Sequence, residues 1–86
     1  MDIAGTIVRL LRQRAADASI CPSDVARALG RDETAWRALM SPVRDEAARM
    51  ARSGRIVITQ GPETIDPADV DHGAIRLRRG PQFPEN

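Results

Sequence analysis

The fold is indicated most clearly by residues 41–79, which read SPVRDEAARMARSGRIVITQGPETIDPADVDHGAIRLRR. Residues 42–53 predict a helix, because a serine and a proline are favourable at its start and Gly54 can end it. Strands are expected at residues 55–60 and 74–79, where apolar side chains alternate with polar ones. The stretch therefore predicts a helix that leads into a β-hairpin with a long connecting loop.

The chain before this stretch begins with an amphipathic helix. Apolar side chains recur in residues 2–14 at the three- and four-residue spacing of one helix face, and Asp2 can cap the first turn. Residues 19–21 precede a proline, which favours an extended backbone. We expect a short strand there, with Ile20 facing the core.

Two further short helices are predicted before the longer one. A proline suits the first position of a helix over residues 22–29, in which Ala28 is expected to face the core and which Gly30 can end. Asp32 can cap the next helix. Trp36 is expected to anchor that helix in a core that has few other aromatic side chains. The serine and proline that follow are expected to separate it from the longer helix.

This order of elements predicts an α+β fold that is mainly α with a small β-hairpin, namely a winged helix-turn-helix. In that fold the short strand at residues 19–21 pairs with the hairpin, and the helix before the hairpin enters the major groove of DNA. The length of 86 residues suits a single domain, which we expect over residues 1–80. An irregular tail is expected over residues 81–86, where Phe83 either packs on the body or is disordered.

Charge is distributed unevenly along the chain, although the net charge is only +1. Residues 1–60 hold ten arginines and seven acids. Residues 61–74, in the hairpin loop, hold no arginine and four acids: Glu63, Asp66, Asp69 and Asp71. The near-neutral balance predicts no strong general attraction to polyanions, and the loop would be repelled by phosphates unless it swings clear of them.

The sequence contains no pattern typical of an enzyme or of a metal or cofactor site. The single histidine, His72, has no Cys/His set around it, and there is no glycine-rich phosphate loop. Cys21 is the only cysteine and cannot form an internal disulfide. No apolar run has the length of a membrane span. We therefore expect a cytoplasmic protein that has no catalytic residues, no cofactor and no membrane contact.

The predicted helix over residues 42–53 and the second strand carry the candidate nucleic-acid-binding residues. Arg44, Arg49 and Arg52 would contact phosphates or base edges of double-stranded DNA, and Arg76 and Arg78 would steady its backbone. A purely structural interpretation remains open for each group. The helix arginines could pair with neighbouring acids on a solvated face, and the strand arginines could protect an exposed sheet edge.

Two other functions remain open from the sequence. The acidic loop over residues 61–74 could meet a basic protein, which would make the chain a protein-interaction module without nucleic-acid binding. Alternatively, the chain could be a structural domain that forms a homodimer through the hairpin edge or the first helix.

A resemblance to a small bacterial family is carried by five segments: SICPSDVARAL at 19–29, WRALM at 36–40, PVR at 42–44, GRIVITQ at 54–60 and GAIRL at 73–77. Together they resemble domain of unknown function 3253, over most of residues 3–79. The resemblance implies a winged-helix-like fold and no established activity, and it supplies no catalytic residues.

Overall fold

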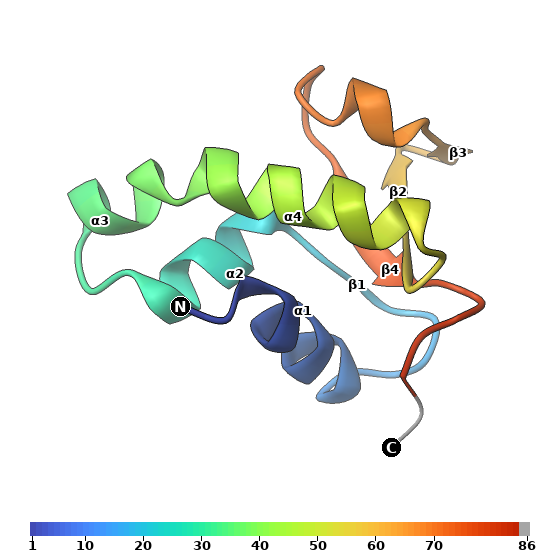
Figure 1. Ribbon diagram of the computed structural model, residues 1–86, viewed down its shortest axis with the longest axis horizontal. Helices are drawn as coiled ribbons and strands as arrows, with labels where there is room; N and C mark the ends of the chain where they lie inside the picture. Colours follow the sequence, from blue (N-terminus) through green and yellow to red (C-terminus); the bar gives the residue numbers. More distant parts are fainter. Residues whose placement is uncertain (85–86) are drawn as a thin grey trace.

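The computed structural model describes residues 1–84, and these form an α+β fold with four α-helices and a four-stranded sheet (Figure 1). The predicted α+β class is therefore confirmed. In chain order the elements are α1 (Ile3–Arg12), β1 (Ser19–Ile20), α2 (Pro22–Leu29), α3 (Glu33–Ala38), α4 (Met40–Arg52), β2 (Ile56–Gln60), β3 (Glu63–Thr64), the 3-10 helix η1 (Pro67–Asp69) and β4 (Arg76–Arg79).

The strands lie in the order β1-β4-β2-β3, and every neighbouring pair is antiparallel. β2 and β4 form the predicted hairpin, with Ile58 opposite Leu77. β1 pairs with the other side of β4, which places Ile20 opposite the same leucine. Because β4 is an inner strand, the interpretation of its arginines as protection of an exposed edge is wrong. The hairpin loop also contains β3 and η1, which were not predicted from the sequence.

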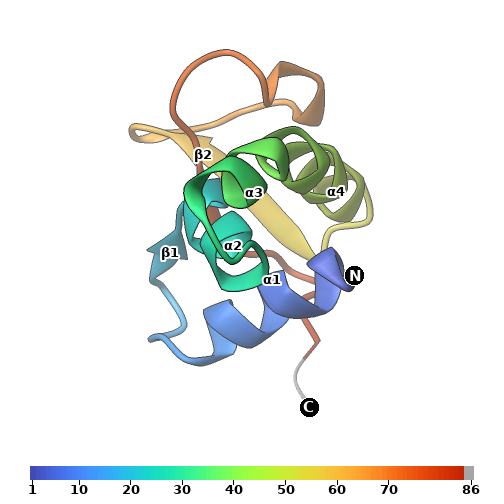
Figure 2. The ribbon, with the colours of Figure 1, turned by 90° about the vertical axis from the view of Figure 1, so that its left-hand side faces the viewer.

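The helices bury their apolar faces against one another and against the sheet. α4 packs on β2, and α2 contacts both α1 and α4 (Figure 2). Ile20 is completely buried, as predicted. The hydrophobic effect of joining these faces is the main force that holds the fold together. The largest fully buried side chains are Ile7, Leu11, Ile20, Val25, Val43, Met50, Ile56, Ile58 and Leu77.

The start of α4 differs from the prediction. The helix begins at Met40, and Ser41 lies within its first turn instead of capping it. The carbonyl of Leu39 accepts the N–H of Val43 at 2.9 Å. Pro42 is tolerated in this turn because the first N–H groups of a helix have no partner inside it. Only Leu39 separates α3 from α4, and its backbone angles are helical.

The contacts of α2 and α3 also differ from the prediction. Ala26 is buried and Ala28 is exposed, because α2 packs against α1, α3 and α4 with the side that carries Ala26. Trp36 is half-buried at the edge of the core. The guanidinium groups of Arg27 and Arg37 lie 4.5 and 4.8 Å from its ring centroid. The tryptophan therefore joins α2 to α3 through cation–π contacts as well as apolar packing.

The C-terminal segment returns to the body of the protein. Phe83 is buried, and the guanidinium of Arg79 lies 4.8 Å from its ring centroid. Residues 85–86, the end of the expected irregular tail, lie outside the described part of the chain. Within residues 1–84, no helix combines the length and the apolar character needed to cross a membrane.

Candidate nucleic-acid interface

Two of the candidate arginines lie on the exposed face of α4. Arg49 and Arg52 are three residues apart and both exposed, because α4 turns Val43, Ala47 and Met50 toward the core. The side chain of Arg49 is 72% exposed and forms an ion pair with Glu46 one turn earlier. The side chain of Glu46 is only 21% exposed, but the pair lies at the helix surface, where such ion pairs contribute little to stability. The arginine can therefore exchange its partner at small cost.

Arg44 has a different role, because it connects α4 to the hairpin loop. Its guanidinium donates hydrogen bonds to the carbonyl of Val70 and, at 3.3 Å, to the carbonyl of Gly73. Val70 is itself buried. On the other side of the loop, Gln60 donates to the carbonyl groups of His72 and Ala74. The acidic loop is therefore held against the domain by side chains from both α4 and β2.

The docked loop brings carboxylates close to the exposed arginines. A shallow cleft of about 340 Å³ separates α4 from the segment around η1, and Arg49 and Arg52 lie on its α4 side. Asp45 from α4 and Asp71 from the loop line the same cleft. Two positive and two negative side chains thus meet there, so the cleft as a whole attracts anions weakly. Within residues 1–84, no group of three or more His, Cys, Asp or Glu side chains could hold a metal.

We expect Arg44→Ala to loosen the loop without unfolding the protein. The substitution removes two hydrogen bonds from a charged donor, each of which contributes on the order of 1–2 kcal/mol. Hydrogen–deuterium exchange should become about tenfold or more faster at amides of residues 66–73, while α1 and α2 keep their protection. Arg52→Ala is the matched control. Equal exchange rates in the two variants would contradict the role of Arg44 in holding the loop against α4.

The candidate arginines of β4 make contacts inside the domain. Arg76 donates to the hydroxyl of Ser19 at 2.9 Å and to its carbonyl at 3.2 Å, and it also contacts the sulfur of Cys21. Arg78 donates to the carbonyl of Asp17 at 2.8 Å. Both side chains are half-buried on the sheet face opposite the core. They attach β4 to the segment before α2, a contact that no local sequence pattern indicates.

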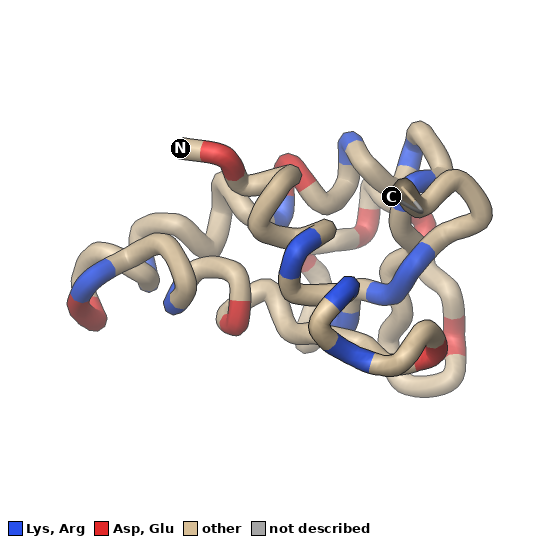
Figure 3. The backbone as a smooth tube through the Cα atoms, turned by 90° about the horizontal axis from the view of Figure 1, so that it is seen from below, with Lys and Arg blue, Asp and Glu red and all other residues tan. Residues whose placement is uncertain are grey.

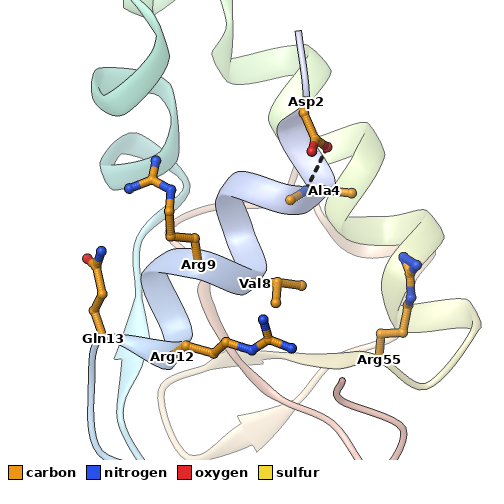
Figure 4. A pocket seen from close by; sticks show the side chains of 8 residues that line it. Asp2, Ala4, Val8, Arg9, Arg12, Gln13 and Arg55 are labelled. Carbon is orange, nitrogen blue, oxygen red and sulfur yellow. Dashed lines mark hydrogen bonds between the residues drawn. The ribbon is translucent and has the colours of Figure 1, made fainter. Parts of the chain in front are cut away.

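A further group of arginines, none of them among the predicted site residues, lies on the side of α1. Arg9 and Arg12 from α1 and Arg55 from the turn after α4 line a groove of about 630 Å³ (Figure 4). The sequence could have indicated that Arg9 and Arg12 lie together, because residues three apart share one face of a helix. Arg55 could not be added to them, since it follows more than forty residues later in the chain.

These features describe a small α+β protein with an exposed arginine pair beside a docked acidic loop. The chain belongs to the family described as protein of unknown function (DUF3253), whose family model matches residues 1–80. The resemblance inferred from the sequence segments is therefore confirmed. No curated protein matches the chain.

Proposed function

We propose that this protein is a winged helix-turn-helix that binds double-stranded DNA through α4. The order of elements supports the winged-helix assignment, because α4 leads directly into the β2–β4 hairpin and β1 pairs with β4. The observation that carries the DNA proposal is the exposure of Arg49 and Arg52 on the outer face of α4. A helix in this position can enter the major groove, where guanidinium groups reach phosphates and guanine edges.

Direct contact with DNA is assigned to Arg49 and Arg52 alone. The guanidinium groups of Arg44, Arg76 and Arg78 already donate to acceptors within the domain. We propose that these three arginines act indirectly, since they hold the loop and β4 in position around α4. The carboxylates beside the cleft should keep non-specific affinity low, because they repel phosphates. Binding to DNA of mixed sequence should therefore reach only the micromolar range at low salt and weaken steeply as salt is added.

A salt titration tests the proposal. Anisotropy of a labelled mixed-sequence duplex should report micromolar binding at about 50 mM salt and much weaker binding at about 200 mM. Arg49→Ala/Arg52→Ala should weaken binding by about tenfold or more at the lower salt. The slope of log K against log salt should fall by about 2, because each lost phosphate contact removes roughly 0.9.

The matched control is Arg14→Ala/Arg31→Ala, which removes the same charge from exposed positions outside α4. This control should change binding by less than about twofold. Equal weakening in the two double variants would show attraction by net charge and contradict an interface on α4. Absence of binding at about 50 mM salt would contradict DNA binding altogether.

The alternative function is recognition of a basic protein segment by the hairpin loop. It is favoured by the docking of the loop, because Asp69 and Asp71 are exposed on a segment that is already ordered. Asp66 is exposed as well and caps η1 by accepting the N–H of Ala68 at 2.8 Å. Replacing all three with asparagine keeps an acceptor at the cap. It should abolish binding of an arginine-rich peptide and leave DNA binding unchanged or stronger.

A further inference from the structure

We propose that the groove beside α1 binds a phosphate group, as a site separate from the cleft on α4. Its basic walls are formed by Arg12, near the end of α1, and by Arg55, in the turn between α4 and β2. In Figure 4 the guanidinium of Arg12 lies next to Val8, Arg55 stands across the groove from it, and Arg9, which also lines the groove, points away from Val8. Arginine positions also gather near the centre of Figure 3, which views the molecule from this side.

The positive charge of the groove is not neutralised by local acids. Within residues 1–84, the ion pairs are Arg37 with Glu33 and Arg49 with Glu46, so none involves the groove. The one carboxylate in its lining is Asp2, which accepts the N–H of Gly5 at 2.8 Å as the cap of α1. Asp2 lies ten residues before Arg12, which is about 15 Å along a helix. The carboxylate of Asp2 therefore lies at the opposite end of the groove from Arg12.

The negative end of the α1 dipole is also covered. Arg79 donates hydrogen bonds of 3.2 Å to the carbonyl groups of Leu11 and Arg14. These carbonyls would otherwise oppose an anion near the last turn of the helix. Arg12 is oriented by a hydrogen bond of 3.0 Å from one guanidinium nitrogen to the carbonyl of Pro84, but unlike Arg44, Arg76 and Arg78 it is exposed, so its other N–H groups can reach a ligand. One wall of the groove is therefore oriented before a ligand arrives, which lowers the entropy cost of binding.

The shape and lining favour a phosphate ester over a carboxylate. A carboxylate is satisfied by one guanidinium fork, whereas a phosphate has enough oxygens to accept from two guanidinium groups at once. Ala4, Gly5 and Val8 add apolar surface to the groove. The volume of about 630 Å³ lies in the range of small-molecule sites. A ligand with a phosphate and a flat aromatic ring, such as a nucleoside phosphate, matches both the two arginines and the apolar surface of the groove.

The test is a titration of the whole protein with ADP at low salt, followed by amide NMR. Shifts should be largest at Gly5, Val8 and Arg55, with small or no shifts at residues 49–52 of α4. The dissociation constant should be about 1 mM or lower. Arg12→Ala and Arg55→Ala should each weaken ADP binding by about tenfold, because each removes one charge-assisted contact. The spectra of the free variants report whether the fold is retained.

Arg31→Ala is the control, because it removes the same charge from an exposed residue outside the groove lining. An equal loss of ADP binding in this control would overturn the proposal, and so would equally strong binding of a short poly-glutamate peptide. If duplex DNA shifts the groove amides and ADP does not, the same two arginines hold a backbone phosphate. If neither shifts them, there is no phosphate site. These results are independent of DNA binding through Arg49 and Arg52.

Discussion

Leu77→Ala should lower the free energy of unfolding by about 2–5 kcal/mol, the largest loss expected from any substitution considered. Leu77 is completely buried in β4, opposite Ile58 on one side and Ile20 on the other. Its side chain therefore packs where three strands meet the helices. Removing it loses the transfer free energy and leaves a cavity, which together cost about 2–5 kcal/mol. A chain of 86 residues has a total stability on the order of 4–13 kcal/mol.

Urea denaturation monitored by circular dichroism measures this loss of free energy. Leu10→Ala is the matched control, because Leu10 is only half-buried on α1 and alanine is favourable in a helix. The control should lose only about 1 kcal/mol. Equal losses in the two variants would contradict the position of Leu77 at the centre of the core.

Gly30→Ala is expected to have the second largest effect on stability. A Cβ atom at this position would lie 2.5 Å from the backbone nitrogen of Trp36 and 2.7 Å from its Cα atom. These are backbone atoms, so α3 would have to move away from the end of α2. The backbone angles of Gly30, φ −97° and ψ 133°, are acceptable for alanine. The expected loss of about 3 kcal/mol is therefore steric.

Gly54→Ala provides the comparison for this variant. Gly54 has φ +80°, and a Cβ atom there would meet the flexible side chain of Gln82 at 3.2 Å. Its cost should be about 1–2 kcal/mol, which is the strain of a left-handed conformation. Urea denaturation compares the two, and the fluorescence of Trp36 should change only in Gly30→Ala. A smaller loss for Gly30→Ala than for Gly54→Ala would refute the close approach of α3.

Local patterns were sufficient to locate most of the secondary structure. Asp2 and Asp32 cap their helices as predicted, because a side-chain oxygen two or three residues before an N–H is a local relation. The alternation of apolar residues in β2 and β4 predicted which side chains face the core. Gly30 lies at the end of α2 as predicted, but its φ of −97° is not the left-handed conformation for which glycine is favoured at a helix end. Its role depends on α3, whose approach no pattern within α2 contains.

The candidate interface was only partly accessible from the sequence. Exposure of Arg49 and Arg52 follows from the helical period of α4. The hydrogen bonds of Arg44, Arg76 and Arg78 do not follow from any local pattern, because their acceptors lie 26 to 61 residues away in the chain. A guanidinium group looks the same in a sequence whether it is free or donates to a buried carbonyl.

The amino-acid order alone thus determined where helices and strands form and which face of each is apolar, because these properties arise from neighbours within a few residues. Tertiary packing decided which arginines remain available to a ligand. The hairpin loop docks on α4 because Arg44 reaches the Val70 carbonyl, and this contact places Asp71 beside Arg49 and Arg52. The groove of Arg12 and Arg55 likewise exists only because α1 lies next to the α4–β2 turn.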